Sequence, residues 1–280
     1  MNTILKKYII FAIASILMAG ALRAQEEELD PNVDRLSIPF RNDSQKRLEA
    51  NLLNGGITVV GYEGEEAIVE AKRRNFEKES VSNNGMRMIQ LPSTGLFAEE
   101  FNNQIKVGSN ALKATVDITI KVPFETSLSL NCVNKGDILI ENITGEIEVQ
   151  NVNGAITINN SSGAVLAHAL NRDIVVTLNE VYPDKPMSFT SLNGDIDLTI
   201  PADTKAELKL QTFNGKIMSD FDIDVEARDK SPKITDGRPE GGRYRLEFEK
   251  AFYGSINGGG PQFIINTHNG VISIRKLTTE

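Results

Sequence analysis

Histidine is the usual general base near neutral pH, and the sequence contains two, His168 and His268. A nucleophilic cysteine would need one of them as its base, but the surroundings of the single Cys132 resemble no cysteine-hydrolase motif. No serine lies in a Gly-x-Ser-x-Gly elbow. We therefore predict exposed or turn histidines, a buried strand cysteine and no catalytic residue.

Carboxylates are the other groups that could do chemistry, because calcium takes several oxygen ligands and nonapeptide β-rolls supply them from Gly-Gly-x-Gly-x-Asp repeats. The first residue after a turn is acidic at only some positions, namely Asp137, Asp173 and Asp195, with Ala155 and Ala164 between them. Alternate acids in the segment Asp220–Glu226 could project together from a strand, but we prefer a solvated loop. Whether that loop binds a cation stays open. We predict no metal site and no cofactor.

The first 24 residues predict a secretory signal peptide. Lys6 and Lys7 form a positive start, an apolar run from Tyr8 to Leu22 follows, and small residues lead to Ala24. The apolar run is shorter than the roughly 20 residues that span a bilayer, so we expect cleavage rather than an anchor. No later apolar stretch is long enough to span a membrane. We expect an exported chain in the periplasm, at the cell surface or outside the cell.

The net charge limits the classes of binding partner, and the cysteine content limits what can hold the fold together. Cleavage after Ala24 removes three basic residues and takes the formal charge from −8 to −11. A chain that acidic gains nothing from a nucleic-acid backbone or an anionic membrane surface. One cysteine allows no internal disulfide and no CxxC motif, so the mature chain must be held together by its core.

A nine-residue repeat between Gly136 and Glu180 predicts the fold. Its units read GDILIENIT, GEIEVQNVN, GAITINNSS, GAVLAHALN and RDIVVTLNE. The third and fifth positions are apolar in every unit, and at 40% hydrophobic content one such column arises by chance about once in a hundred. Apolar positions two apart share one face of a short strand.

Stacking these units about 4.8 Å apart would bury a continuous column of Ile and Val. Glycine at the start of the first four units would supply the positive φ of a sharp corner, and Arg172 starts the fifth. Asn142, Asn151 and Asn160 recur at one position and predict an amide ladder beside the turns. The predicted fold class is all-β, a right-handed parallel β-helix or β-solenoid of short stacked strands with Gly/Asn turns. A β-sandwich or prism is the alternative.

The order of such phrases along the chain resembles the bacterial putative-adhesin family. It runs from NGGITVVG at 54–61 through IKVP at 120–123, the Gly-x-Ile units and TIP at 199–201 to THNGVISI at 267–274. The likeness covers about residues 35–276, and the order is more specific than any single phrase. It implies a Gly-turn β-solenoid domain of unknown function, related to autotransporter adhesin head domains, and it brings no catalytic residues.

The predicted organisation is a signal peptide at 1–24, a flexible acidic leader at 25–34 and a single β-solenoid adhesin-like domain at 35–280. Two polar, turn-rich stretches interrupt the pattern, and we expect an excursion or hairpin at 73–113 and a projecting loop at 219–243. The 21 residues from Gly194 to Gly215 predict a wider coil towards the C-terminus.

These observations favour a non-enzymatic exported protein of the cell envelope or surface, an adhesin-like interaction module whose partner is an unknown envelope protein or a glycan. Two alternatives stay open. A polysaccharide-degrading β-helix enzyme would need clustered carboxylates, for which Asp195 and Asp197 are the nearest candidates. A periplasmic envelope-stress sensing or regulatory module would dock onto a membrane protein.

Overall fold

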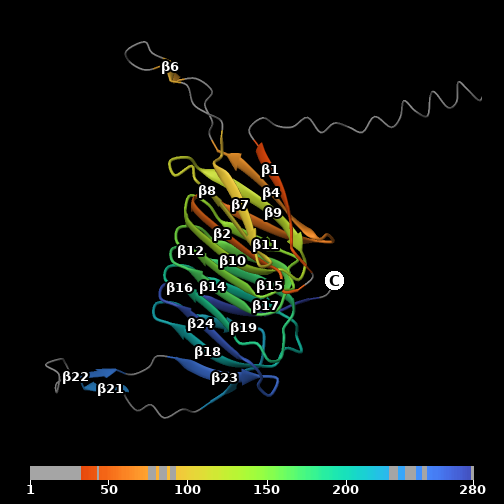
Figure 1. Cartoon of the computed structure of the whole chain (residues 1–280). Helices are drawn as coiled ribbons and strands as arrows, with labels where there is room; N and C mark the ends of the chain where they lie inside the picture. Colours follow the sequence, from red (N-terminus) through yellow and green to blue (C-terminus); the bar gives the residue numbers. More distant parts are fainter. Residues whose placement is uncertain are drawn as a thin grey trace, which may run out of the picture.

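A computed structural model describes residues 33–42, 44–74, 80–81, 87–88, 93–226, 233–236, 244–247 and 251–278. In these residues the chain is all β, with short strands stacked into two mostly parallel sheets around one apolar core (Figure 1). The prediction of a β-solenoid is confirmed. The predicted signal peptide and most of the predicted acidic leader lie outside the described residues, and strand pairing begins at Val33.

The two sheets, named A and B here, hold ten and eleven strands of the described chain. In spatial order, sheet A contains β1 (Val33–Pro39), β4 (Glu66–Arg73), β9 (Val116–Pro123), β3 (Ile57–Tyr62), β11 (Ile138–Glu141), β13 (Ile156–Ser162), β15 (Ile174–Glu180), β17 (Ile196–Ile200), β25 (Ile272–Lys276) and β19 (Ile217–Ser219). Sheet B contains β20 (Asp224–Val225), β23 (Phe252–Ile256), β18 (Ala206–Thr212), β24 (Gln262–Thr267), β16 (Met187–Ser191), β14 (Val165–Ala169), β12 (Ile147–Asn151), β10 (Ser127–Asn134), β2 (Arg47–Asn54), β8 (Gln104–Ser109) and β7 (Leu96–Phe101). Two separate hairpins pair β5 (Ser80–Val81) with β6 (Arg87–Met88) and β21 (Lys233–Asp236) with β22 (Tyr244–Glu247).

Each coil gives one strand to each sheet, so two nine-residue units make one coil. Ile138 pairs with Ile156 in sheet A, and Ile147 pairs with Val165 in sheet B, each 18 residues further along the chain. The predicted apolar columns face inward and are almost completely buried. Full burial of one Val or Ile side chain contributes about 1.5–3 kcal/mol, and each coil covers the columns of the next.

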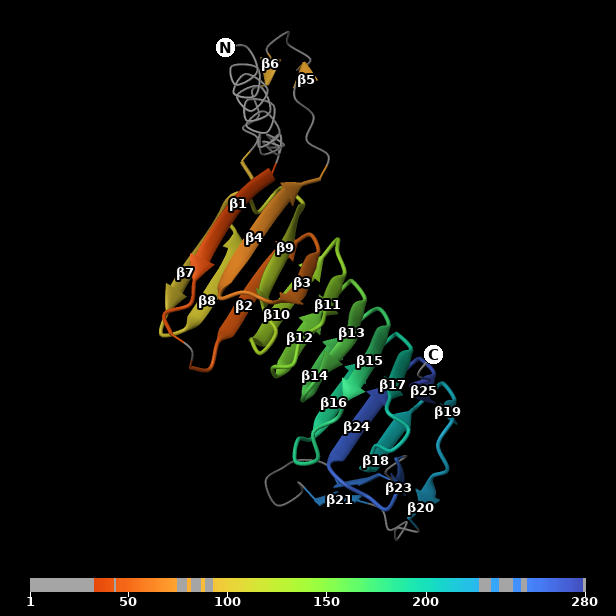
Figure 2. The same ribbon diagram turned by 90° about the vertical axis from the view of Figure 1, so that its right-hand side faces the viewer.

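The coils are not stacked in the order of the sequence. The coil β24–β25 lies between the coils β16–β17 and β18–β19 in both sheets, as Figure 2 shows. The coil β2–β3 likewise lies between β8–β9 and β10–β11. The turns that begin at Pro123 and Pro201 each carry the chain past one position in the stack, and a coil from elsewhere in the sequence fills that position.

This order corrects the interpretation of the 21-residue spacing. Gly194 and Gly215 do not lie in neighbouring coils, because the corner of Gly270 packs between them. A wider coil does occur between β15 and β17, where Ile174 pairs with Ile196, 22 residues further along the chain.

Part of the stretch 73–113, predicted as an excursion, belongs to the solenoid. β8 pairs in parallel with β2, and its Ile105 and Val107 are buried in the core. β7 returns antiparallel onto β8 through a turn in which Asn102 and Asn103 have positive φ. Because these polar turn residues directly precede β8, the sequence pattern there indicates a loop and does not reveal the short buried strand.

The stretch 219–243, predicted as a projecting loop, also contributes to the stack. Phe221 is buried, and β20 pairs with β23 at the end of sheet B. The hairpin β21–β22 follows, and the other residues of 227–250 lie outside the described parts of the chain.

Glycine is needed at these corners chiefly for close approach, which corrects the expected positive φ. A Cβ on Gly154 would lie 1.9 Å from the carbonyl oxygen of Gly136 in the coil before it, and its φ is not positive. A backbone atom cannot yield that much space, so only glycine fits. Positive φ occurs at Gly163, and at Asn142 and Asn160 in the same corner.

The predicted ladder of Asn142, Asn151 and Asn160 is also corrected. Alternate nine-residue units turn at opposite corners, so Asn142 and Asn160 occupy one corner while Asn151 is buried in the other. A real amide ladder runs along that second corner. Each asparagine donates from Nδ2 to Oδ1 of the one before it in the stack, at 2.8–3.1 Å, in the order Asn134, Asn153, Asn171, Asn193, Asn269 and Asn214.

A second polar column lies inside the same corner and ties each coil to its neighbour. Asn151, Ser191, Thr267 and Thr212 each donate a side-chain hydrogen bond, at 2.9–3.2 Å, to a turn carbonyl of the preceding coil in the stack. Cys132 occupies the equivalent position, with its Sγ 2.8 Å from the carbonyl oxygen of Gly55. The thiol thus satisfies a carbonyl that would otherwise be buried without a partner.

Candidate functional site

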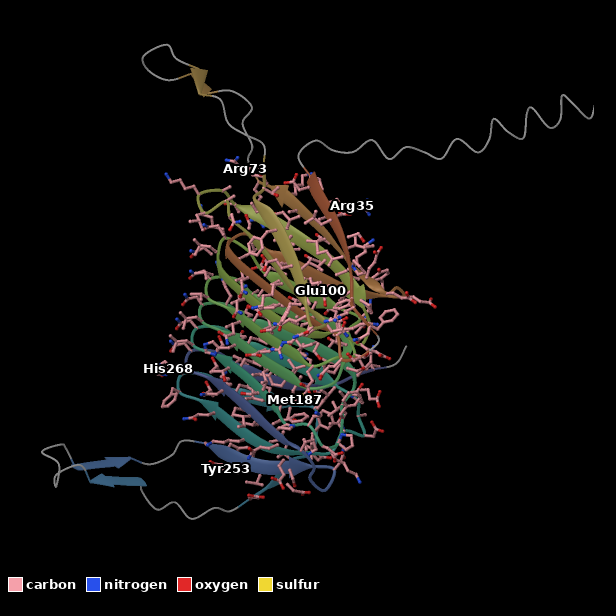
Figure 3. All side chains as sticks on the ribbon, in the orientation of Figure 1. Arg35, Arg73, Glu100, Met187, Tyr253 and His268 are labelled. Atoms are coloured by element: carbon pink, nitrogen blue, oxygen red, sulfur yellow. The ribbon has the colours of Figure 1, made fainter. Side chains whose placement is uncertain are left out.

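The histidines and the cysteine lie on opposite sides of sheet B. His168 is exposed on the outward side of β14, and His268 is exposed just beyond the end of β24, at one margin of the stack (Figure 3). Cys132 is 2% exposed in β10, and burial raises the pKa of its thiol to about 11. At neutral pH the thiol is therefore protonated, and the sheet separates it from both imidazoles.

The acids that follow turns bind the backbone of the neighbouring coil. Oδ1 of Asp137, Asp173 and Asp195 each accepts a hydrogen bond, at 2.8 Å, from a backbone N–H one coil further along the stack. The two carboxylate oxygens of Asp197 instead share the single N–H of Arg275 Nε, at 2.9 and 3.0 Å. Both carboxylates of the candidate pair Asp195 and Asp197 thus have structural partners.

The segment Asp220–Glu226 is folded against the end of the stack. Oδ2 of Asp220 accepts a hydrogen bond from the backbone N–H of Lys276 at 3.4 Å, and Phe221 is buried. Within the described part of the chain, no three His, Cys, Asp or Glu side chains converge as a metal would require.

The outward face of sheet A carries paired charges. Arg275 lies 2.9 Å from Asp197, and Arg35 lies 3.2 Å from Glu70. Both pairs are largely solvated, so they contribute little to stability and more to the character of the surface.

The outward face of sheet B carries a continuous uncharged column, here called the polar column. Its members are neighbours in register on successive strands, in the order Asn51, Asn131, Gln150, His168, Thr190, Asn266 and Gln211. In the described part of the chain, the side chains of His168, Thr190 and Asn266 make no hydrogen bond to another residue. Their donors and acceptors therefore face solvent.

Three neighbouring strands around this column form an uncharged surface, here called the panel. It consists of nine of the outward side chains on β14, β16 and β24 and on the residues that follow each strand: Leu166, His168, Leu170, Ser188, Thr190, Leu192, Ile264, Asn266 and His268. None is Asp, Glu, Lys or Arg. Leu166 and Leu192 expose 50% and 43% of their surface, so the panel combines aliphatic and hydrogen-bonding groups.

A hollow of about 260 Å³ adjoins the panel at Leu166. Its wall holds two ion pairs, between Arg47 and Glu148 at 3.7 Å and between Lys185 and Glu146 at 2.8 Å. Because each cation faces an acid, the hollow adds little net charge beside the panel.

Comparison with models of protein families shows to which family this chain belongs. The family model described as Toastrack DUF4097 matches residues 36–243, most of the chain. The chain belongs to the Toastrack DUF4097 family. The resemblance seen in the sequence is thereby confirmed, together with the solenoid fold.

Two solved structures are among those found similar to this Toastrack chain, both with TM-scores below 0.5. One is described as a putative cell adhesion protein from Clostridium sporogenes, with a TM-score of 0.45, 11% identity, and coverage of 88% of this chain and 100% of the other. The other is described as a putative adhesin from Bacteroides fragilis, with a TM-score of 0.32, 11% identity, and coverage of 88% and 97%. No curated protein matches significantly.

The polar column of this Toastrack domain was only partly visible in the sequence. Gln150 and His168 fall in the outward positions of the nine-residue repeat, but Asn266 joins them only because β24 is inserted beside β16. The signal that could have found it is the phrase Thr267–Ile274, whose residues before the Asn-Gly turn match those of the other coils.

Among the described residues, no helix has the length and apolarity to cross a membrane.

Proposed function

We propose that the chain is an exported, non-enzymatic interaction module of the bacterial envelope or cell surface, and that it binds its partner through the panel. The observation that carries the proposal is the absence of charge on nine neighbouring outward side chains. Broad uncharged surfaces of mixed polarity are typical of binding faces.

The support beneath the panel favours binding through preformed geometry. Each panel strand is paired on both sides within sheet B, and its inward residues, including Phe189 and Phe263, are fully buried. The amide ladder joins the ends of the same strands. Side chains held on such a frame lose little further conformational freedom when a ligand binds.

The two alternatives have less support. An enzyme acting on polysaccharides would need free carboxylates close together, whereas Asp195 and Asp197 are each bound to structural partners. An envelope-stress sensor would use the same panel to dock onto a membrane protein, and it differs from an adhesin in location and ligand.

The test is retention of labelled protein on cells. Residues 25–280 are incubated with intact cells and isolated envelopes of a bacterium that expresses the protein. The panel variant is Thr190→Lys with Asn266→Lys, two neighbours in register on β16 and β24. The matched control is Thr177→Lys with Thr199→Lys, two neighbours in register on the outward face of sheet A. Both variants add the same charge at half-buried positions.

We expect the panel variant to lower retention about tenfold or more, as loss of a central contact does, and the sheet A variant to leave it unchanged. Wild-type protein that is retained on neither cells nor envelopes would contradict the proposal, and so would equal losses for both variants. Protease treatment of intact cells then separates a surface location, which gives degradation before lysis, from a periplasmic one.

A further inference from the structure

The panel arranges its groups in rows with different chemistry. The central row, part of the polar column, holds the imidazole of His168, the hydroxyl of Thr190 and the amide of Asn266. On the side of the amide ladder, the flanking row begins with the aliphatic Leu170 and Leu192. A ligand that matches this surface must present hydrogen-bonding groups along its middle and C–H groups beside them. A sugar ring, with hydroxyls on its edge and C–H bonds on its faces, has both.

The rows repeat along one straight direction. Neighbouring strands in a sheet lie about 4.8 Å apart, so each row offers one side chain per coil at that interval. A sugar unit in an extended, equatorially linked chain advances by a closely similar distance. A peptide strand lying along the same direction would cross the strands of sheet B and could not pair with their backbones, which already bond to each other.

The negative charge of the chain and the absence of charge on the panel favour a neutral sugar chain over an acidic one. The chain carries a formal charge of −8, yet the panel itself contains neither acid nor arginine nor lysine. An acidic polysaccharide would be repelled by the acidic chain and would find no cation on the panel to offset this repulsion. A neutral chain meets no such cost, and the polar column can satisfy its hydroxyls.

An aromatic pair ends the panel on the side of β18. The rings of Phe213 and His268 lie 4.9 Å apart with 34° between their planes, and both residues are exposed. Aromatic ring faces carry partial negative charge and attract the C–H face of a sugar. The pair thus offers a stacking surface at the end of the row where an extended chain would finish.

We propose that the panel binds an extended neutral glycan, which lies along the stack with about one sugar unit per coil and stacks a terminal unit on Phe213 and His268. This inference rests on the proposed function, because it names the ligand of the same face. The polar column supplies hydrogen bonds to successive hydroxyls, and the leucines contact the ring faces.

The test is titration calorimetry of residues 25–280 with defined oligosaccharides. The neutral probes are cellohexaose, mannohexaose and chitohexaose in their extended 1,4-β-linked forms, with the corresponding disaccharides, and the acidic probe is hexagalacturonate. We expect at least one neutral hexaose to bind about tenfold or more tightly than its disaccharide and than hexagalacturonate. The variant Thr190→Lys with Asn266→Lys should weaken that binding about tenfold or more, while Thr177→Lys with Thr199→Lys should change it less than about twofold.

The variant Phe213→Ala separates the stacking role from the rest. It should weaken the hexaose several-fold and leave the disaccharide nearly unchanged, because only the longer chain reaches both the polar column and the ring pair. Tighter binding of hexagalacturonate would overturn the inference. A second result would also overturn it: none of the three neutral hexaoses binds, retention still depends on the panel, and protease treatment of the envelopes abolishes that retention. The partner would then be a protein. Absence of retention as well would instead overturn the proposed function itself.

Discussion

The panel on sheet B and the charged outward face of sheet A cover the same core but differ in chemistry. Sheet A displays ion pairs such as Arg275 with Asp197, whereas the panel on sheet B displays no charged pair at all. Outward side chains alternate with core side chains along every strand, so the fold accepts either chemistry on either face. The core explains the architecture but not the difference between these two surface regions, which the proposed function attributes to a binding partner of the panel.

The largest expected effect separates core from face on a single strand. Phe189 is fully buried and Thr190 beside it faces outward. Phe189→Ala should lower the free energy of unfolding by about 3–5 kcal/mol, because the lost ring leaves a cavity. Thr190→Ala should change it by less than about 0.5 kcal/mol. Urea unfolding followed by circular dichroism measures both, and similar losses would break the distinction between core and face.

The inner side of sheet B should also show a pH dependence through Cys132. Burial raises its thiol pKa from 9.0 to about 11, so above pH 9 the unfolded chain releases a proton that the folded chain keeps. The stability contributed by the protonated thiol is complete below pH 9 and is lost as the pH rises to about 11, a loss of about 2–3 kcal/mol.

Urea unfolding of wild type and Cys132→Ser between pH 8 and 11 isolates this contribution, because serine does not titrate there. The stability of wild type relative to the variant should fall across that window. A difference that stays constant would show that the thiol reaches solvent.

A smaller effect is expected from the buried side chains that donate to turn carbonyls inside the corner. Thr267→Val removes the hydrogen bond to the carbonyl oxygen of Gly194 and leaves that buried oxygen without a partner, which should cost about 1–3 kcal/mol. Thr267→Ser keeps the donor and should retain most of this stability. Thermal unfolding compares the two, and equal losses would mean that the methyl group matters more than the hydroxyl.

The smallest effects compare the amide ladder with the ion pairs of sheet A. Asn171 makes two ladder bonds, and Asn171→Ala should cost about 1 kcal/mol regardless of salt. Asp197→Asn should have a smaller effect that disappears at high salt, because the pair with Arg275 is solvated and screened. Thermal unfolding at 0.05 M and about 1 M NaCl tests both, and a ladder effect that falls with salt would contradict its assignment to neutral amides.

The sequence predicted the solenoid because its apolar columns repeat, and the columns from Ile138 to Val176 are buried as expected. It could not predict the order of the coils. The inward residues are chemically alike from coil to coil, so Ile272 fits beside Ile196 as well as Ile217 would.

The same ambiguity concealed the panel. Nine-residue units overlay two opposite corners, so the sequence pointed to Asn142, Asn151 and Asn160 instead of the ladder that begins at Asn134 and Asn153. The polar column depends on the insertion of β24, which only the register of β16 with β24 reveals.

The position of β24–β25 has a consequence for how the chain reaches its final form. Val271 bonds to Asp195, 76 residues earlier, and contacts between such distant residues form late because a long loop must close first. Until residues 262–276 have been made, β16–β17 and β18–β19 have no strand to join them. Truncation just before β24 would therefore not shorten the solenoid at its end. It would divide the stack internally and separate its last coil from the rest.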